Sequence, residues 1–234
     1  MSRTEETPRA APLRCLTWNL HGFIGEGRRP DPERTLRVIR EVGADVAALQ
    51  EVDGRTHLGR LPRAFERLAE GLGGYVLEAR LYGEGECAYG HVLWSRYPLH
   101  GEVVLLPGPG FEPRGAIRAS VATPHGSLTV LATHFGLRPR ARRRQAEAVA
   151  SLVGPGPTIA LGDLNEWNPA GGVDRRLRAA LPERAALPSW PARRPLTPLD
   201  RVYAGGGARI LEARTVPATR PASDHLGLVV ELEF

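Results

Sequence analysis

The chain has 234 residues, which is enough for one sizeable domain and short for two. Hydrophobic residues make up 42% of it and charged residues 24%, as in ordinary globular proteins. No stretch approaches the run of about 20 apolar residues that a transmembrane helix requires, and the polar start MSRTEETPRAAP lacks the apolar core of a secretory signal. We therefore expect a cytoplasmic protein with no transmembrane segment.

The formal charge of +5 by itself favours an anionic partner such as nucleic acid. All 31 basic residues are arginine, however, and alanine, glycine and proline are abundant. This pattern is typical of codon bias in a GC-rich genome, where arginine replaces lysine throughout. The basic charge is therefore weak support for nucleic-acid binding.

The two cysteines give no sign of a metal site. Cys15 lies in an apolar run and Cys87 in a stretch rich in glycine and glutamate. Neither has a second cysteine or a histidine at the spacing of a zinc site. In a chain without a secretory signal this favours reduced thiols, with Cys15 as a small core residue.

Short apolar runs alternate with amphipathic stretches along the chain, after a predicted flexible tail at residues 1–12. The first strand is predicted at 13–18 and the first helix at Pro32–Val42. Asp31 is a suitable N-cap for that helix, a proline occupies its first position, and Gly43 ends it.

The later elements follow from the same apolar periodicities. Further helices are predicted at 61–72, 140–152 and 174–180. Further strands are predicted at 46–49, 75–79, 91–94, 101–106, 116–123, 128–133, 158–161, 202–204, 208–214 and 226–232. Helices and strands alternate early and strands dominate later. We therefore expect a single mixed-sheet α/β domain over residues 13–234, with two packed sheets and outer helices.

Rare polar residues stand where the apolar strand runs stop. In LRCLTWNLHG, DVAALQEVDG, LTVLATHFG and TIALGDLNEW an apolar strand ends on a polar side chain, and in PLDRVYA and ASDHLGLVV polar residues precede the strand. Strand ends that meet at one edge of a sheet are common places for active sites. One such residue usually just satisfies a turn, but six segments of this kind predict a shared site. The candidates are Asn19, Glu51, His134, Asp163, Asn165, Asp200, Asp224 and His225.

These residue types suit metal-assisted hydrolysis. Four carboxylates and two carboxamides supply hard oxygen ligands, which favour Mg²⁺ or Mn²⁺ over zinc. A substrate phosphate completes the coordination of such an ion. The two histidines can donate hydrogen bonds to phosphate oxygens, or move a proton to or from the attacking water.

The segments TWNLHG, LQE, GHVLWSRYPL, RGAI, ATHFG, GDLNEW, LDRV and SDHLGLV occur in the order typical of the endonuclease/exonuclease/phosphatase superfamily, which the chain resembles from Leu13 to Glu233. This superfamily includes abasic-site endonucleases, secreted deoxyribonucleases, sphingomyelinases and inositol-phosphate 5-phosphatases. Each segment alone is weak evidence for the superfamily, but all of the segments in this order are specific to it. The resemblance implies a four-layer α/β sandwich, in which two mixed β-sheets pack face to face with helices outside. It also implies attack of water on phosphorus without a covalent enzyme intermediate.

The resemblance implies metal-binding and phosphate-binding roles for several candidates. Glu51 would be a metal ligand, with Asn19 beside it touching metal or phosphate. Asp224 would complete the metal side of the site. Asn165 would hold a phosphate oxygen, and Arg114 of the RGAI segment would also reach the phosphate.

Catalytic roles would fall on four other residues. Asp163 would orient or deprotonate the nucleophilic water. His225 would contact the scissile phosphate, oriented by Asp200, which fixes the tautomer and raises the basicity of the ring. His134 would be a second phosphate contact or the acid that protonates the leaving group.

Two features depart from the family pattern. His91 stands in the GHVL segment where the family usually has asparagine, so the substrate contact expected there is not carried over to this chain. The deoxyribonuclease branch pairs the histidine of the TH segment with a glutamate, for which Glu84 and Glu86 are the candidates here.

Arginines crowd residues 138–144, at the start of the third predicted helix. They could follow the backbone of a nucleic acid. A solvated helix face is favoured instead, with Arg143 paired to Glu147 one turn later and Ala141 and Ala148 facing inward.

The sequence therefore predicts a Mg²⁺- or Mn²⁺-dependent phosphoester hydrolase, expected to act as a monomer. Two substrate classes remain open, namely nucleic acid and the lipid or small-molecule phosphates. The chain lacks insertions in which aromatic residues alternate with basic ones, which base-stacking nucleases use. A non-catalytic binding module on the same fold is a third hypothesis, and the intact set of Asn, Glu, Asp and His residues argues against it.

Overall fold

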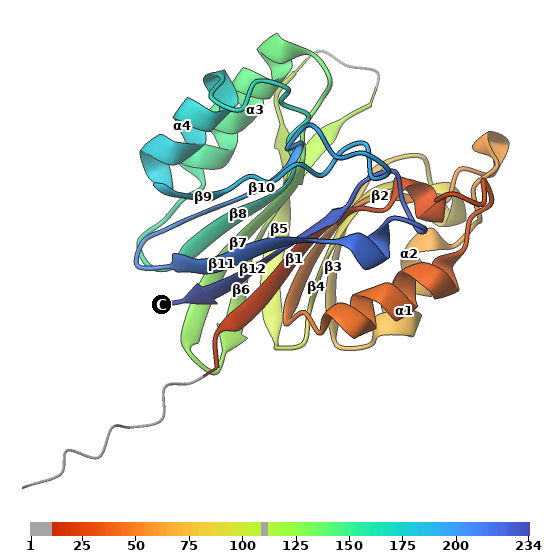
Figure 1. Cartoon of the computed structure of the whole chain (residues 1–234), viewed down its shortest axis with the longest axis horizontal. Helices are drawn as coiled ribbons and strands as arrows, with labels where there is room; N and C mark the ends of the chain where they lie inside the picture. The colour runs from red at the N-terminus through yellow and green to blue at the C-terminus, as the bar shows by residue number, and fades with distance from the viewer. Residues whose placement is uncertain (1–10, 109–111) are drawn as a thin grey trace, which may run out of the picture.

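Two six-stranded β-sheets pack face to face in the computed structural model, which describes residues 11–108 and 112–234 (Figure 1). Two helices cover the outer face of each sheet. The predicted four-layer α/β sandwich with two mixed sheets is therefore confirmed. The tail expected at residues 1–12 lies almost wholly outside the described residues.

The first sheet has the strand order β11-β12-β1-β2-β4-β3, with β1 parallel to β2 and the other neighbours antiparallel. Its strands are β1 (Leu13–Asn19), β2 (Val46–Asp53), β3 (Tyr75–Tyr82), β4 (Tyr89–Ser95), β11 (Arg209–Val216) and β12 (Gly227–Glu233). The helices α1 (Pro32–Val42) and α2 (Ala64–Leu72) pack on its outer face, where Ile39 and Phe65 join Trp18 in a buried apolar layer.

The second sheet has the order β5-β6-β7-β8-β10-β9, with β7 parallel to β8. Its strands are β5 (Leu99–Leu106), β6 (Arg114–Thr123), β7 (Gly126–His134), β8 (Thr158–Asp163), β9 (Glu183–Ala185) and β10 (Asp200–Gly205). The helices α3 (Pro139–Ser151) and α4 (Gly172–Ala180) cover its outer face, where Val149 and Leu177 pack with Tyr203.

A third apolar layer fills the space between the two sheets. Alternate residues of the central strands point into it, because successive side chains of a strand point to opposite faces. Leu93, Val130, Leu161, Val202 and Leu228 belong to this layer and are buried. A shift by one residue would turn every one of these side chains outward, so the apolar layer fixes the register of each strand.

The predicted strands stop too early at one end of the sandwich. The apolar pattern ends at Trp18 and Leu161, but backbone pairing continues to Asn19 on β1 and to Asp163 on β8. The predicted helices are confirmed to within three residues at each end, whereas β9 was not predicted. None of the helices within the described residues is long and apolar enough to cross a membrane.

The first helix begins and ends as predicted. The backbone N–H of Arg34, which has no acceptor within α1, donates to Asp31 Oδ1 at 2.9 Å. Gly43 follows the helix with φ 64° and ψ 38°, a left-handed conformation that glycine adopts without steric cost. These two signals fix the helix that packs over β1 and β2.

Replacing Asp31 by alanine removes the acceptor from this cap. We expect the free energy of unfolding to fall by about 1 kcal/mol, measured by urea denaturation, because the Arg34 N–H loses its partner. Asp31→Asn is the matched control, since it keeps an acceptor oxygen and should retain most of the stability. Equal stability of Asp31→Ala and the unchanged protein would contradict the capping role.

Candidate active site

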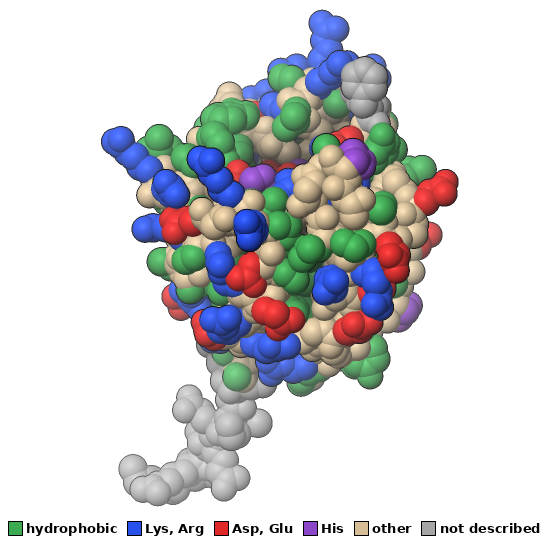
Figure 2. Space-filling view, turned by 90° about the vertical axis from the view of Figure 1, so that its right-hand side faces the viewer, with side chains coloured by type: hydrophobic (Ala, Val, Ile, Leu, Met, Phe, Trp, Pro, Cys, Tyr) green, Lys and Arg blue, Asp and Glu red, His purple; other side chains and the backbone are tan. Residues whose placement is uncertain are grey.

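The layer between the sheets changes from apolar to polar where β7 and β8 end. On β7, Val130 and Ala132 face the core, and His134 continues the same face. On β8, Leu161 is followed on that face by Asp163. Figure 2 shows the side of the molecule toward which these strand ends lie, with histidine side chains visible mainly in its upper half and acidic and arginine side chains over both halves. The site is thus the polar end of the core.

A second polar layer lies one step deeper between the sheets. The Gln50 amide donates to Thr17 Oγ1 at 3.2 Å, and the hydroxyl donates back to Gln50 Oε1 at 3.4 Å. His91 pairs with Gln50 across β2 and β4 and is 0% exposed. Burial lowers the pKa of His91 to about 4, so its ring is neutral at pH 7. The residue that departs from the family pattern therefore lies beneath the site and is closed to solvent.

Asn19 connects the two sheets at the site. Its Nδ2 donates to Glu51 Oε1 at 3.0 Å and to Asp163 Oδ2 at 2.9 Å. Glu51 belongs to the same sheet as Asn19, and Asp163 belongs to the opposite sheet. The other end of the amide, Asn19 Oδ1, accepts a hydrogen bond from the backbone N–H of His21 at 2.9 Å. Both ends of the amide are used, which fixes its orientation with the donor end toward the carboxylates.

The side chain of Glu51 points toward Asn19 because β2 is bulged. Gln50 already faces the core, so regular alternation would turn Glu51 to the outer face. The register of β2 against β4 shifts between Gln50 and Val52, and Glu51 has φ 53°. This left-handed conformation is costly for a residue with a Cβ atom and is typical of functional sites. The bulge directs the carboxylate to Asn19 and leaves it reachable from solvent, with 27% of the side chain exposed.

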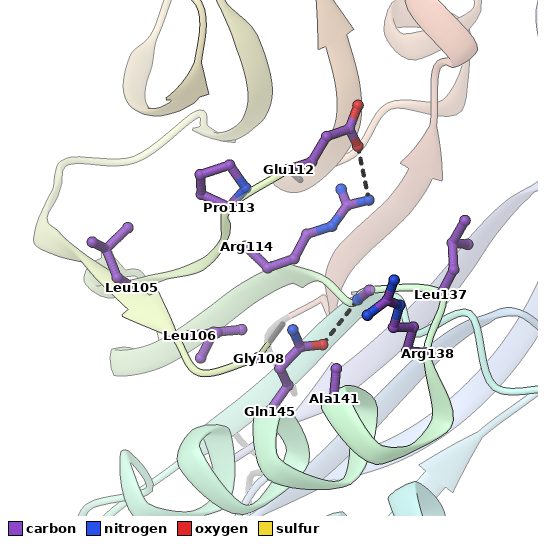
Figure 3. A pocket seen from close by; sticks show the side chains of 11 residues that line it. Leu105, Leu106, Gly108, Glu112, Pro113, Arg114, Leu137, Arg138, Ala141 and Gln145 are labelled. Atoms are coloured by element: carbon purple, nitrogen blue, oxygen red, sulfur yellow. Dashed lines mark hydrogen bonds and ion pairs between the residues drawn. The ribbon is translucent and has the colours of Figure 1, made fainter. Parts of the chain in front are cut away.

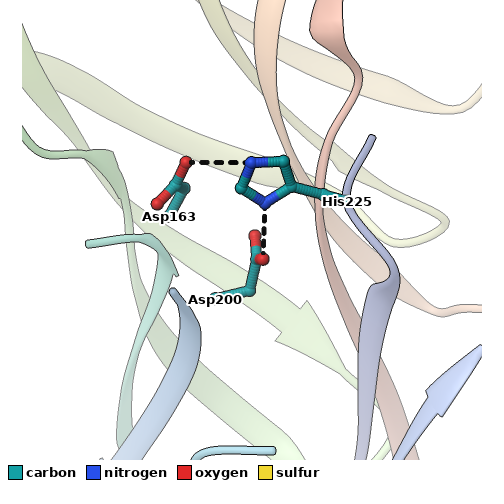
Figure 4. Close-up of side chains that lie close together, drawn as sticks. All are labelled: Asp163, Asp200 and His225. Carbon is teal, nitrogen blue, oxygen red and sulfur yellow. Dashed lines mark hydrogen bonds and ion pairs between the residues drawn. The ribbon is translucent and has the colours of Figure 1, made fainter. Parts of the chain in front are cut away.

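His225 is held between two aspartates (Figure 4). Its Nδ1 lies 2.8 Å from Asp200 Oδ2, and its Nε2 lies 3.9 Å from Asp163 Oδ2. Asp200 is fully buried, and its backbone N–H donates to Ser189 Oγ at 3.2 Å. Asp200 Oδ1 has no hydrogen-bond partner among the residues that the structure describes. The structure thus brings together the predicted Asp200–His225 pair and Asp163.

The backbone around His225 is fastened to β1. The backbone N–H of His225 donates to Ser223 Oγ at 3.1 Å, and the Ser223 hydroxyl donates to the Asn19 carbonyl at 2.7 Å. The indole N–H of Trp18 donates to the His225 carbonyl at 3.1 Å. The loop before β12 is therefore positioned by the same strand that carries Asn19.

Burial and neighbouring charges shift the pKa values of His225 and Asp163. Burial alone would lower the pKa of His225, but the carboxylates of Asp200, Asp163 and Asp224 outweigh it and raise this pKa to about 10. Burial raises the pKa of Asp163 to about 6, and Asp200 adds to the rise while His225 opposes it. At pH 7 His225 is therefore cationic, and Asp163 is close to its own titration.

His134 lies near the same Asp163 oxygen. Its Nε2 is 3.6 Å from Asp163 Oδ2 and 3.2 Å from Asn165 Nδ2, and its Nδ1 is 3.2 Å from Arg114 Nη1. Asn165 is anchored by donating from Nδ2 to the Phe135 carbonyl at 2.9 Å. The Arg114 guanidinium and the Asn165 amide nitrogen are both donors, so the unprotonated nitrogen of a neutral ring accepts from one of them.

Arg114 lies beside His134, on the side of its Nδ1. Its guanidinium contacts His134 Nδ1, donates to the Tyr89 hydroxyl at 3.2 Å and pairs with Glu112 at 3.1 Å. Among the described residues neither Glu84 nor Glu86 forms a hydrogen bond or ion pair with His134, whereas Glu51 Oε1 lies 4.0 Å from His134 Nε2. Burial, reinforced by the charge of Arg114, lowers the pKa of His134 well below its usual value. His134 is therefore neutral at pH 7.

Asp224 lies at the rim of the site. Its carboxylate is 3.4 Å from His21 Nδ1, and the Trp190 indole N–H donates to it at 3.4 Å. Trp190 packs edge-on against Trp167, with ring centroids 5.2 Å apart. Among the described residues, the acidic and histidine side chains whose ligand atoms cluster most closely are Asp163, Asp200 and His225, and neither Asp224 nor Glu51 belongs to that group.

Buried charges behind the site were missed in the sequence. Arg142 donates to the Leu137 carbonyl and lies 3.7 Å from Glu166 Oε1. Arg201 is fully buried and donates to the Glu166 carbonyl. Glu166 lies in the GDLNEW segment and Arg201 in the LDRV segment, but no sequence periodicity indicates that an arginine is buried.

The arginine-rich start of α3 is only partly the solvated face that was expected. Arg142 is buried, whereas Arg143 is exposed. Glu147 pairs with Arg176 of α4 at 2.5 Å instead of with Arg143. The predicted Arg143–Glu147 pair is therefore wrong, because the neighbouring helix supplies a closer cation.

The donor set of the site fits a divalent cation. Asp163, Asp200 and His225 present ligand atoms that all lie within 4.8 Å of one another, and Asn19 links Glu51 to this group. Carboxylate oxygens suit Mg²⁺ and Mn²⁺. The buried Asp200 Oδ1 without a hydrogen-bond partner is a further oxygen that a cation could satisfy. His225 Nδ1 is already engaged by Asp200, so the carboxylates are the more available ligands.

Comparison with known proteins identifies the family. The sequence pattern of the Endonuclease/Exonuclease/phosphatase family matches residues 16–225. The chain belongs to this family. Its members are phosphoester hydrolases, and the chain is one of this class. No curated protein matches the chain by sequence.

Several solved structures share the fold of this family member. A crystal structure of an endonuclease/exonuclease/phosphatase from Beutenbergia cavernae has 28% identity and a TM-score of 0.76, over 96% of this chain and 72% of that one. The mannosyl-6-phosphatase of Bacteroides thetaiotaomicron has 14% identity and a TM-score of 0.70, over 95% of this chain and 100% of that one. D. rerio TDP2 complexed with a single-strand DNA product has 14% identity and a TM-score of 0.69, over 95% of this chain and 99% of that one.

The Asp200–His225 pair should be visible in histidine NMR spectra of the metal-free protein. Because the folded pKa of about 10 exceeds the usual 6.5, we expect His225 to remain protonated at pH 8. Its contribution to stability is present below about pH 6.5 and is lost as the pH rises toward 10.

Asp200→Asn removes the charge but keeps the side-chain shape. We expect the pKa of His225 to fall by more than one unit in this variant, as followed by ring ¹⁵N shifts. Glu102→Gln, on the exposed part of β5, is the control and should leave the titration unchanged. An unaltered His225 titration in Asp200→Asn would refute the assigned pairing.

Proposed function

We propose that the protein is a Mg²⁺- or Mn²⁺-dependent phosphoester hydrolase that uses water as its nucleophile. The observation that carries this proposal is the position of Asp163 Oδ2. This one oxygen accepts the Asn19 hydrogen bond at 2.9 Å and has His134 and His225 nitrogens at 3.6 and 3.9 Å. A neutral imidazole and an imidazolium thus lie close to one carboxylate oxygen, beside Glu51, whose side chain is 27% exposed.

Asp163 and His225 have complementary tasks in this proposal. Asp163 accepts the proton of the attacking water, and its pKa of about 6 suits a base that works near neutral pH. His225 is cationic and donates from Nε2 to a phosphate oxygen, while Asp200 holds Nδ1 and keeps the ring charged. The water oxygen forms the new bond to phosphorus, and the bond to the leaving oxygen breaks.

His134 acts as a hydrogen-bond donor in the proposed reaction. A ring that is neutral because of its lowered pKa is a poor source of a proton for the leaving group. Of the two roles that the resemblance implied, the phosphate contact therefore fits better. Asn165 and Arg114 lie on either side of His134 and would bind the remaining phosphate oxygens.

The proposed metal ion would be held by Glu51, with Asn19 positioning the carboxylate. When bound, it would neutralise charge on the phosphate and orient it for in-line attack. Asp224 would serve the outer side of this metal site, near His21 and Trp190. We further propose that the protein works as a monomer in the cytoplasm.

Both substrate classes fit this chemistry. A nuclease is supported by the Trp167–Trp190 pair beside Asp224, since Trp167 is 56% exposed and could stack on a base. A phosphodiesterase or phosphatase of lipid or small-molecule phosphates is supported by the aliphatic pocket that borders Arg114 on the other side of the site.

Asp163→Asn tests the proposed base. We expect kcat/KM for bis-p-nitrophenyl phosphate to fall about 10²- to 10⁴-fold, because asparagine cannot accept the proton of water. EDTA should abolish turnover by the unchanged protein, and Mg²⁺ or Mn²⁺ should restore it. Glu102→Gln is the surface control and should retain full activity. Turnover that survives EDTA, or an Asp163→Asn variant as active as the control, would contradict the mechanism.

A substrate panel separates the two classes. Plasmid DNA, abasic oligonucleotide, RNA and a phospholipid set should be compared with bis-p-nitrophenyl phosphate in the presence of Mg²⁺. A nuclease would cleave the nucleic acids with the highest kcat/KM and would lose activity in a Trp167→Ala variant. Cleavage of lipid or small phosphates alone would remove the nuclease proposal.

A further inference from the structure

A pocket of about 610 Å³ opens directly beside the site, on the side of Arg114 (Figure 3). It lies between the end of β5, the start of β6 and the start of α3. Arg114 belongs both to this pocket and to the contact with His134. A group bound here would therefore be attached to, or lie next to, the phosphate in the site.

Aliphatic side chains form much of the pocket wall. The lining includes Leu105, Leu106, Pro113, Leu137 and Ala141. Leu105 is 70% exposed and Leu137 is 72% exposed, although large apolar side chains are usually buried. A ligand that covered both leucines would remove a large apolar area from water.

The polar groups of the pocket largely satisfy one another. Glu112 pairs with Arg114 at 3.1 Å, and the backbone N–H of Gly136 donates to Gln145 Oε1 at 2.8 Å. Arg138 is exposed. Apart from Arg138, these groups are already engaged and offer little for reading the edge of a base. Among the described residues that line the pocket, the side chains are aliphatic or polar and none is aromatic.

We propose that this pocket binds an aliphatic group of the substrate, so that the substrates are phosphoesters of aliphatic alcohols. This inference rests on the proposed hydrolase function and names the substrate class of the same site. Binding should strengthen with chain length, because each methylene placed on the leucines is removed from water. A fully buried methylene is worth about fourfold in affinity, and about twofold is expected in an open pocket.

The test measures the Kd of methyl-, butyl- and octylphosphonate by calorimetry on the full chain with Mg²⁺. These probes share one headgroup and differ only in the aliphatic group. We expect octylphosphonate to bind at least tenfold more tightly than methylphosphonate. In the double variant Leu105→Ser/Leu137→Ser this ratio should fall below threefold. Both leucines are exposed, so the change should not disturb folding.

Leu211→Ser is the matched control, because this leucine is 49% exposed on β11 and lies outside the pocket lining. Its octyl-to-methyl ratio should equal that of the unchanged protein. A ratio near one in the unchanged protein, or an equal ratio in the double variant, would overturn the proposal. Tighter binding of thymidine 5′-monophosphate than of octylphosphonate would overturn it in favour of a nucleoside.

Turnover of bis-p-nitrophenyl phosphate is measured separately on the same protein. Absence of turnover would contradict the proposed hydrolase function, whereas the calorimetric ratio reports only on the pocket. The two proposals can therefore fail independently.

Discussion

The amide of Asn19 donates to carboxylates carried by both sheets, and the candidate site is arranged around this contact. Stacked sheets lie about 10 Å apart, so side chains from facing strands meet only if both registers are correct. Asn19 and Glu51 come from the first sheet and Asp163 from the second. The two hydrogen bonds join a pair of anions that would otherwise repel each other. The contact therefore depends on the apolar layer beneath it, which sets the register of β1 and β8.

Charge compensation is the second constraint on the site. Asp163 and Asp200 are both buried, and burying an unpaired carboxylate is costly. His225 lies between them and is cationic because their attraction outweighs its loss of hydration. Removal of a proton from His225 would leave two buried anions with less compensation. Because a phosphate brings further negative charge, the donor set fits a cation that balances it.

Much of the fold could be predicted from the sequence, and so could several of the polar side chains that lie together at the candidate site. Asn19 and Asp163 end apolar strands, and the alternation along β1 and β8 places them on the core face. The bulge of β2 could not be predicted, because nothing in DVAALQEVDG marks Glu51 as left-handed. Its side chain reaches Asn19 only through that backbone conformation.

Contacts made by residues at strand ends and in loops could not be predicted from the apolar periodicity either. The contact of Arg114 with His134 Nδ1 arises because β6 lies beside β7 and brings the guanidinium to that nitrogen. Asp224 is adjacent to His225 in sequence, yet its carboxylate faces His21 and Trp190 at the rim. Periodicity specifies the face on which a strand residue lies, but it does not specify the direction of a residue in a loop.

The candidate chemistry and the candidate specificity are carried by different parts of the scaffold. Asn19, Asp163 and His134 lie on central strands, where backbone pairing on both sides limits movement. The leucines of the aliphatic pocket lie at the end of the edge strand β5 and in the loop before α3. Exposed positions of this kind can change without disturbing the core, because they contribute little to its packing. A family with one reaction and many substrates is the expected consequence, since the pocket can vary while the buried hydrogen-bond network stays the same.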